Sequence, residues 1–239
     1  LTESLDNAWQ MAYNVFRRNI VAYSDPQARL FQCGNLPFDK TESDYNLIWH
    51  GGLPVLTGQS RLKATRGPNL VPNPGFEEGE VGALPTSWAW QVRPNDSLAV
   101  ADAAMPANGD QCLRIEARGT TTDSSGQTLR TNIVSADIPM KPGQTYRLSA
   151  RARADAPDTG LALMPQAYVP NVFFWAKGTT VQIGREWRDV ETVFRFPAPG
   201  DSDYHEGMEA IKVRIDVAQE TGTIWVDDVT VREADVMDE

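Results

Sequence analysis

The sequence is poor in cysteine and histidine, with two of each among 239 residues. This scarcity argues against a disulfide framework or a zinc cluster, because both need several such side chains. Apolar residues never run for the roughly 18 positions that a membrane-spanning helix requires, so none is expected. Basic residues are also in the minority, since 22 Lys and Arg stand against 32 Asp and Glu, a net charge of −10. That balance argues against nucleic acid or a membrane surface as partner.

Recognisable catalytic signatures are missing as well. The sequence contains no Gly-rich phosphate loop, no Gly-x-Ser-x-Gly and no His-Glu-x-x-His motif. His50 and His205 lie in different regions, and neither has a nucleophile at a useful spacing. Acidic residues such as Asp201 and Glu206 lie in turns, without sign of the enclosed carboxyl pair that glycoside hydrolysis needs. Catalysis by this chain alone is therefore not expected.

The periodicity of the apolar residues divides the chain into residues 1–66 and 67–239. In the first region, apolar residues recur three and four apart from Leu5 to Ile20, which predicts an amphipathic helix. Ala28–Cys33 predicts a short strand, and Glu42–His50 predicts a second helix. This N-terminal α/β segment is too short to enclose a core alone. We interpret it as the end of a catalytic domain or the linker to one.

In the second region the apolar residues alternate with polar ones, as in strands that bury one face. The alternating segments are Leu113–Arg118, Tyr146–Arg153, Val190–Phe196, Ile211–Val217 and Ile224–Val231. Turn-forming residues separate them, so the fold class is mainly β, an antiparallel β-sandwich. The first region has 7 basic and 6 acidic residues and the second has 15 and 26, so the excess acidity belongs to the sandwich.

Five landmarks occur in a fixed order along the second region. They are Asn69–Gly79 with Pro85 and Trp88, Gly109 with Cys112–Ile115, Lys141–Tyr146 before a strand, Glu186-Trp187, and Trp225–Val229. This set resembles the carbohydrate-binding modules of families 4, 9 and 22 over residues 69–233. The resemblance implies a jelly-roll sandwich, of the galactose-binding-like kind, appended to a secreted polysaccharide-degrading enzyme. Similar openings also occur in related sandwiches whose role is structural.

The same resemblance implies a structural calcium ion near the chain ends of the sandwich. Its ligands would be Glu77, one of Asp227 and Asp228, and backbone carbonyls, with Asp110 as a further candidate. Ca²⁺ takes six to eight hard oxygen ligands, and neighbouring strand residues face opposite ways, so only one of the two aspartates should point at the metal. The alternative is that these are solvated turn acids without a metal.

A sugar site needs an exposed aromatic ring beside planar polar groups. Trp90 has Gln91 beside it, and Gln166 and Tyr168 share one face of a predicted strand. Trp175 closes a run of three aromatic residues that follows Pro170-Asn171, a predicted loop, and three consecutive aromatic side chains cannot all point inward. That run could equally be a hydrophobic patch that docks onto another domain.

Three arginines complete the candidate sugar-binding set. Arg151, Arg153 and Arg214 lie on polar faces of predicted strands, and a cluster of guanidinium groups would suit a uronate or sulfated glycan. The alternative is that they pair with Asp216 and Glu116 across strands.

Two further expectations concern the interior. Trp88, Trp187 and Trp225 flank apolar strands and are predicted to pack in the core. Cys33 and Cys112 could bridge the two regions in a secreted protein, but Cys112 lies in a predicted strand, which favours a buried free thiol.

Taken together, the sequence predicts a non-catalytic, polysaccharide-binding module of a carbohydrate-active enzyme, extracellular or periplasmic in location. Its partners would be a poly- or oligosaccharide and a catalytic domain in the same or a longer chain. Two alternatives stay open. One is a structural sandwich that braces a catalytic domain without binding glycan. The other is a fragment of a glycoside hydrolase or polysaccharide lyase whose active site lies mostly elsewhere.

Overall fold

The computed structural model describes residues 15–24, 42–49, 51, 61–169 and 173–237, with only the main chain described at 42–44, 61–64, 173 and 236–237. The chain forms two compact units, Leu1–Lys63 with Val236–Glu239, and Ala64–Asp235. None of the described residues belongs to a helix that is long and apolar enough to cross a membrane.

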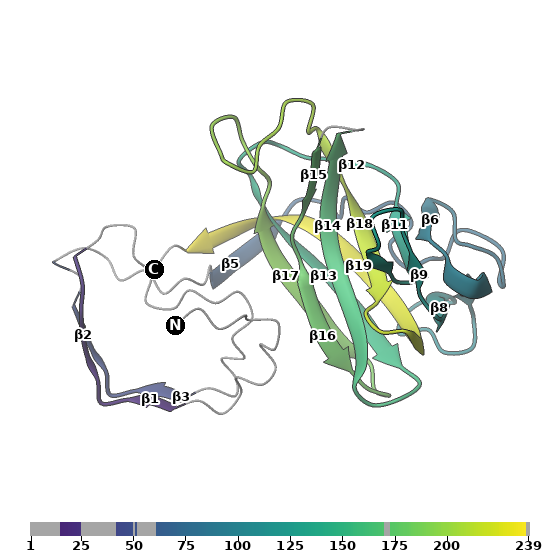
Figure 1. Ribbon diagram of the computed structural model, residues 1–239, viewed down its shortest axis with the longest axis horizontal. Helices are drawn as coiled ribbons and strands as arrows, with labels where there is room; N and C mark the ends of the chain where they lie inside the picture. Colours follow the sequence, from purple (N-terminus) through teal and green to yellow (C-terminus); the bar gives the residue numbers. More distant parts are fainter. Residues whose placement is uncertain (1–14, 25–41, 50, 52–60, 170–172, 238–239) are drawn as a thin grey trace. The chain divides into compact units, whose positions relative to one another are not determined.

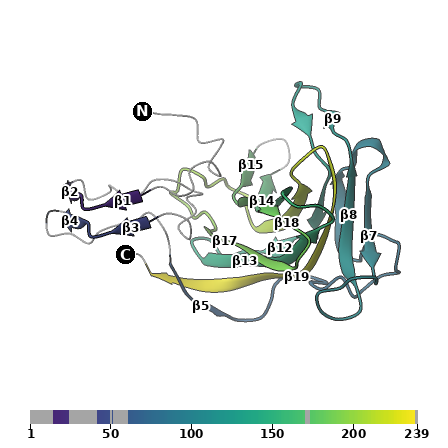
Figure 2. The same ribbon diagram turned by 90° about the horizontal axis from the view of Figure 1, so that it is seen from below.

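The larger unit is built from two antiparallel sheets (Figures 1 and 2). The seven-stranded sheet has the order β15-β14-β18-β11-β6, with β12 paired to β18 and β16 to β14. Its strands are β6 (Trp88–Val92), β11 (Asn132–Ser135), β12 (Ile138–Pro139), β14 (Thr159–Val169), β15 (Phe173–Ala176), β16 (Thr179–Ile183) and β18 (Ala210–Val217).

The six-stranded sheet has the order β17-β13-β19-β8-β7, with β5 paired to β19. Its strands are β5 (Arg61–Arg66), β7 (Leu98–Asp102), β8 (Cys112–Arg118), β13 (Thr145–Ala154), β17 (Arg188–Arg195) and β19 (Thr221–Met237). A hairpin of β9 (Thr121–Thr122) and β10 (Thr128–Leu129) and one turn of 3-10 helix, η3 (Pro94–Asp96), lie outside both sheets. The antiparallel sandwich predicted from the alternating segments is confirmed.

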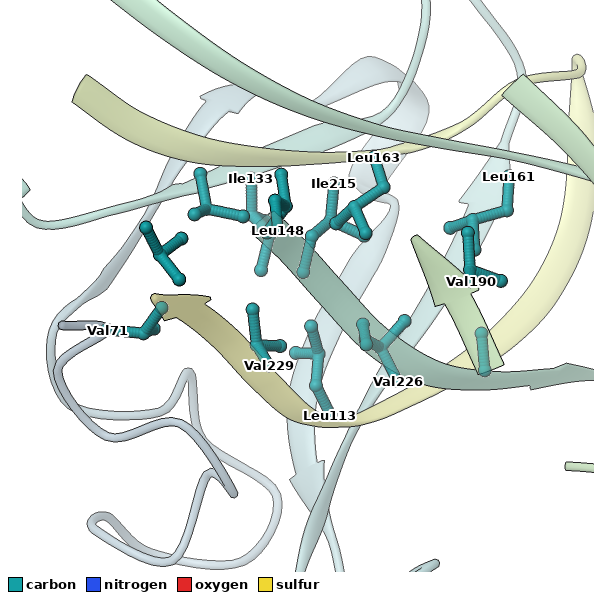
Figure 3. Close-up of a cluster of buried hydrophobic side chains, with 14 of the residues drawn as sticks. Val71, Leu113, Ile133, Leu148, Leu161, Leu163, Val190, Ile215, Val226 and Val229 are labelled. Carbon is teal, nitrogen blue, oxygen red and sulfur yellow. The ribbon is translucent and has the colours of Figure 1, made fainter. Parts of the chain in front are cut away.

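The core lies between the two sheets and follows from the alternation of each strand. In β13 every second residue is buried, including Leu148, while Arg147 and Ser149 point outward. Leu161 and Leu163 of β14 and Ile215 of β18 approach from the other sheet, and Figure 3 shows these aliphatic side chains meeting in one layer. Burying each such side chain contributes about 1.5–3 kcal/mol.

The beginning and the end of the sandwich are joined to each other. The N–H of Leu70 donates to Val231 O (2.9 Å), and the N–H of Val229 donates to Pro74 O (2.9 Å). The side chain of Asn69 adds two bonds, since its Nδ2 donates to Val229 O (2.9 Å) and its Oδ1 accepts from Val231 N (3.0 Å). The first described segment of the sandwich therefore lies along its last strand, β19.

Asn73 organises the turn that follows this contact. Its backbone has φ +47, and its buried side chain donates to Glu78 O (3.0 Å) and Thr86 O (2.9 Å) and accepts from Glu78 N (3.0 Å). Phe76, also at positive φ, packs on Trp88 with ring centroids 5.1 Å apart. Asn73 rather than Gly75 has positive φ in this turn, because the short polar side chain of Asn73 stabilises that conformation locally.

A second turn, at 141–144, precedes β13. Gly143 has φ +77, and its N–H donates to Phe196 O (2.9 Å). A side chain would be strained at this φ. The turn delivers the chain into β13.

The described part of the smaller unit contains strands where helices were predicted. β1 (Val15–Arg17) pairs in parallel with β3 (Glu42–Asp44), and β2 (Ile20–Ala22) pairs in parallel with β4 (Leu47–Trp49). The predicted second helix at 42–50 and the C-terminal part of the first helix are therefore wrong. Three-residue strands joined by a kink at positive φ give apolar spacings that imitate a helical period. The predicted strand at 28–33 lies outside the described residues.

Substitution of Asn73 tests how far one side chain holds the opening turn. Asn73→Ala should lower the free energy of unfolding by about 2–3 kcal/mol, because buried groups lose their partners and the backbone is strained. Asn73→Gly is the matched control, since it removes the same hydrogen bonds but accepts positive φ, and should cost about 1 kcal/mol less. Urea denaturation followed by fluorescence measures both. Equal stability of Asn73→Ala and the wild type would contradict this role.

Candidate binding site

A hollow of about 310 Å³ opens on the seven-stranded sheet, a volume at the lower end of the range for small-molecule pockets. It lies where β14 and β18 run side by side, and its polar lining includes Asp137, Gln166, Tyr168, Glu209 and Lys212. Tyr168 is 60% exposed, so part of its ring faces solvent. The structure therefore places Gln166 and Tyr168 together, as their spacing on one strand predicted.

Two buried amide groups on this sheet have oxygens without hydrogen-bond partners in the described part of the chain. Gln166 is 4% exposed; its Nε2 donates to Gln91 Oε1 (3.3 Å), while its own Oε1 accepts nothing. Asn132, in β11, is 1% exposed; its Nδ2 donates to Arg130 O (2.9 Å), and its Oδ1 is likewise unpaired. Buried polar atoms normally have a partner, so these oxygens are acceptors that a hydroxyl-bearing ligand or water can satisfy.

Arg214, the third candidate on this sheet, forms an ion pair within its own strand. Its Nε donates to Asp216 Oδ1 (2.6 Å), and its Nη2 donates to Asp216 Oδ2. Burial raises the pKa of Asp216, and the hydrogen bonds and charge of Arg214 act in the opposite direction. The sequence named Asp216 as an alternative partner of the arginines across strands, whereas the structure pairs it with Arg214 within β18.

Trp90 and Trp175 do not lie on this surface. Trp90 pairs with the buried Ile133 and packs against the core, with the guanidinium of Arg93 5.2 Å from its ring centroid. Trp175 lies in β15 and is only 4% exposed, with its ring centroid 6.1 Å from that of Phe194. The prediction that the ring of Trp175 stacks on sugar is wrong, because strand alternation turns this ring into the core. Trp90 is half-buried, and its contact with sugar stays a prediction.

Arg151 and Arg153 lie on the other sheet, away from Gln166 and Tyr168. The guanidinium of Arg151 lies 6.0 Å from the ring centroid of Trp187, and that of Arg153 lies 5.3 Å from that of Trp225. Trp225 alternates with buried neighbours, so its ring points outward, and its Nε1 donates to Asp102 Oδ2 (3.1 Å).

The three tryptophans predicted in the core therefore behave differently. Trp88 is buried at 5% exposure, whereas Trp187 and Trp225 are half-buried beside arginines. The predicted arginine cluster is correspondingly divided, since Arg214 belongs to the opposite sheet. Glu116, named as a cross-strand partner, pairs with Arg118.

The acidic residues at the chain ends of the sandwich come together around Gly75. A Cβ added there would lie 3.8 Å from Asp227 Oδ1 and 3.9 Å from Glu77 Oε1. Glu77 Oε1 accepts from the N–H groups of Asp110 (3.0 Å) and Gln111 (3.3 Å).

Asp227 is the buried member of this group. Its Oδ2 accepts from the N–H groups of Ala107 (2.9 Å) and Asn108 (3.0 Å). Burial raises the pKa of this carboxyl, and those N–H groups and that of Asp228 oppose the shift. A nearby cation would therefore stabilise the charged form of the Asp227 carboxylate.

The neighbouring candidates contribute less. Asp228 has φ +49 and donates its N–H to Asp227 Oδ1 (2.7 Å), whereas Asp110 contributes its N–H and leaves its side chain exposed. Within the described ranges, no three His, Cys, Asp or Glu side chains lie together as a metal-ligand group. A cation here would need main-chain and amide oxygens as well, and the buried Oε1 of Gln111, which has no partner among these residues, is one such oxygen.

Cys112, beside this group, is a buried free thiol as expected. Burial, with the charges of Asp227 and Asp102, raises its pKa to about 12. Cys33 lies outside the described residues.

Several lining residues escaped the sequence analysis. Lys212 and Asp137 come from a strand and a loop and are brought together only through the pairing of β12 with β18. Lys212 occupies an outward position in a predicted strand, and this position was the one sign in the sequence that its side chain could line a surface site. No local pattern reports which strands become neighbours.

Removing Arg214 tests the buried ion pair. Arg214→Ala should lower the free energy of unfolding by about 3 kcal/mol at pH 7, because it leaves the carboxylate of Asp216 buried and unpaired. Burial then raises the folded-state pKa of Asp216 further, so the deficit is largest above that pKa and shrinks as the pH falls below it. The control is Arg147→Ala, whose exposed pair with Glu191 should contribute less than about 1 kcal/mol. A deficit independent of pH, measured by urea denaturation, would contradict this account.

Three comparisons with known proteins bear on this architecture. A family model described as a carbohydrate binding domain matches residues 68–205. The CBM22-1 xylan-binding domain of Xyn10C from Paenibacillus barcinonensis superposes with a TM-score of 0.50 at 12% identity, covering 73% of this chain and 99% of that one. A CBM22-1–GH10 structure of xylanase 10B from Clostridium thermocellum, complexed with xylohexaose, superposes with a TM-score of 0.49 at 15% identity. The match covers 70% of this chain and 29% of that one.

No curated protein matches the sequence. The family model nevertheless spans more than half of the chain, across most of the sandwich. The chain therefore belongs to the carbohydrate-binding domain family of the type 4 and 9 modules.

Proposed function

We propose that the sandwich binds a polysaccharide through the hollow on its seven-stranded sheet and holds it beside a catalytic domain, in a secreted enzyme. The observation that carries this proposal is the buried, unpaired amide oxygen of Gln166 in that hollow; the unpaired oxygen of Asn132 lies elsewhere on the same sheet. Sugars present hydroxyl groups that donate to such acceptors and flat C–H faces that pack on aromatic rings. Tyr168 supplies an exposed ring in the same hollow.

The charge of the hollow favours a neutral glycan. Lys212 Nζ lies 3.8 Å from Asp137 Oδ1, and the guanidinium of Arg214 is already occupied by Asp216. No cation in this lining is therefore left without a nearby carboxylate, and we expect neutral hydroxylated ligands. Affinity should fall between about micromolar and millimolar, because the ligand exchanges water hydrogen bonds for protein ones.

Affinity electrophoresis through gels that contain xylan, mixed-linkage glucan or galactan tests this site. The wild type should be retarded by at least one of these, and Tyr168→Ala or Gln166→Ala should weaken the association about tenfold, which corresponds to about 1.4 kcal/mol. Trp187→Ala is the aromatic control, because that ring lies by the six-stranded sheet. Loss of binding in Trp187→Ala alone would place the site on the other sheet. No retardation by any neutral or anionic glycan would favour a bracing role without glycan binding.

We further propose that Glu77 and Asp227 help to hold a structural calcium ion. Three observations support a fit: the two carboxylates flank Gly75, burial raises the pKa of Asp227, and Gln111 has a buried amide oxygen without a partner in the described part of the chain. Oxygen ligands of this kind are those that Ca²⁺ prefers. When bound, the ion would supply charge neutralisation between the first turn and β19, a purely structural task.

Glu77→Gln is the sharpest test of the calcium site. Both hydrogen bonds that Glu77 accepts from described residues go to Oε1, so Gln keeps them and loses only the charge. Added Ca²⁺ should raise the melting temperature of the chelated wild type by several degrees, through ligand linkage. Glu77→Gln should melt near the chelated wild type and bind Ca²⁺ about tenfold more weakly by calorimetric titration. An unchanged melting temperature and no heat of binding in the wild type would contradict the site.

A further inference from the structure

The two parallel strand pairs of the smaller unit share one offset. Val15 pairs with Glu42 and Ile20 pairs with Leu47, and the aligned Asn19 and Asn46 are 27 residues apart. Figure 2 shows β1 beside β3 and β2 beside β4. Since one offset fits both pairs, the chain returns to the same path one strand spacing away. Successive passes of this kind are coils of a parallel β-solenoid.

The corner between the strands repeats as well. Arg18 and Tyr45 have φ 55 and 54, and each is followed by an asparagine. Such a conformation is uncommon for residues other than glycine, so its recurrence at equivalent positions indicates a built corner. It joins β1 to β2 in one coil and β3 to β4 in the next.

The asparagines bond one corner to the other. Asn46 Oδ1 accepts from the backbone N–H (3.0 Å) and Nδ2 (3.1 Å) of Asn19, and Asn46 Nδ2 donates to Phe16 O (2.7 Å). Asn46 thus links its own coil to the one before it. Asn19 occupies the same position in the earlier coil, but its Nδ2 donates to Arg17 O within that coil (3.0 Å). Its Oδ1 has no bond to any described residue.

Two parallel coils cannot bury their side chains alone. Ile20 is 80% exposed and Leu47, its neighbour across the pair, is 64% exposed. Parallel sheets are buried structures, and repeat folds need about three or more units for stability. On the edge formed by β1 and β2, Ile20 is therefore an exposed apolar side chain and Asn19 Oδ1 an acceptor without a bond to a described residue, and a stacked coil would cover both.

We propose that the β1–β2 edge docks a further coil of the same parallel β-solenoid, with an asparagine corner that stacks on Asn19. Such a coil would donate its main-chain N–H or carboxamide to Asn19 Oδ1, as Asn19 does to Asn46. A second copy of the chain fits less well, because head-to-tail stacking of this edge would not close and would form filaments. The carbohydrate-binding sandwich is then the appendage of a solenoid, a conclusion independent of which glycan it binds.

An added coil tests this proposal directly. A copy of residues 15–27 placed before Leu1 sets a new asparagine 27 residues ahead of Asn19, matching the spacing to Asn46. Hydrogen exchange of the amides of 15–22, followed by mass spectrometry in the full chain, should slow by roughly tenfold. Two extra residues between the copy and Leu1 provide the control, because they break the period. Equal exchange in all three chains, or equal slowing by both additions, would overturn the proposal.

A crosslink keeps the test independent of how the added coil folds. Val21 pairs with Ile48, so Val21→Cys with Ile48→Cys should oxidise readily, since the Cα atoms of paired strands lie within disulfide range. Val21→Cys with Leu47→Cys should not, because those side chains point to opposite faces. If the pair Val21→Cys and Ile48→Cys does not oxidise, β2 and β4 are not paired in this register, and the proposal of a coil is overturned. Slow exchange of 15–22 that appears only at high protein concentration, with dimers in sedimentation, would assign the edge to a second copy.

Discussion

The pairing of the first segment of the sandwich with its last strand is the constraint on which the rest of the structure depends. β19 lies between β13 and β8 in the middle of its sheet, and Asn69 and Leu70 bond to its outer part. The six-stranded sheet is therefore complete only when both ends of the domain are in place. Contacts so distant in sequence have a high closure cost, which predicts slow folding. The same closure brings Glu77 to Asp227.

The two outward faces of the sandwich have become different surfaces. On the six-stranded sheet, arginine side chains lie over Trp187 and Trp225, and acidic partners such as Asp102 complete the contacts. On the seven-stranded sheet, amide and aromatic groups surround a hollow, and two acceptors stay unpaired. Since an unpaired buried acceptor costs about 1–3 kcal/mol, the second face retains a local instability that a hydroxylated ligand can relieve. The two faces therefore differ in the kind of unpaired group among their described residues: acceptors on the seven-stranded sheet, and the buried Nε donors of Arg114 and Arg153 on the six-stranded sheet.

Much of the sandwich could be predicted because the alternation of apolar and polar residues within each strand indicates which side chains are buried. The segments around Leu148 and Ile215 alternate clearly, and the structure has strands at both. Gln166 and Tyr168 were found because two residues on one strand share a face whatever its neighbours are. The predictions that Trp175 contacts sugar and that Trp225 packs in the core were wrong for the opposite reason. Their exposure depends on which side of the strand faces the core, and adjacent aromatic or acidic residues left that choice open in the sequence.

The smaller unit shows the other limit of sequence reasoning. Short strands and a left-handed corner place Phe16 and Ile20 four residues apart, the spacing of a helical face. The better signal was the recurrence of an asparagine after 27 residues, with an apolar residue directly behind it at Ile20 and Leu47. One repeat of such a pattern is too little to recognise without coordinates. It becomes decisive once parallel pairing is seen, because only a coil returns both strands and their corner to the same register.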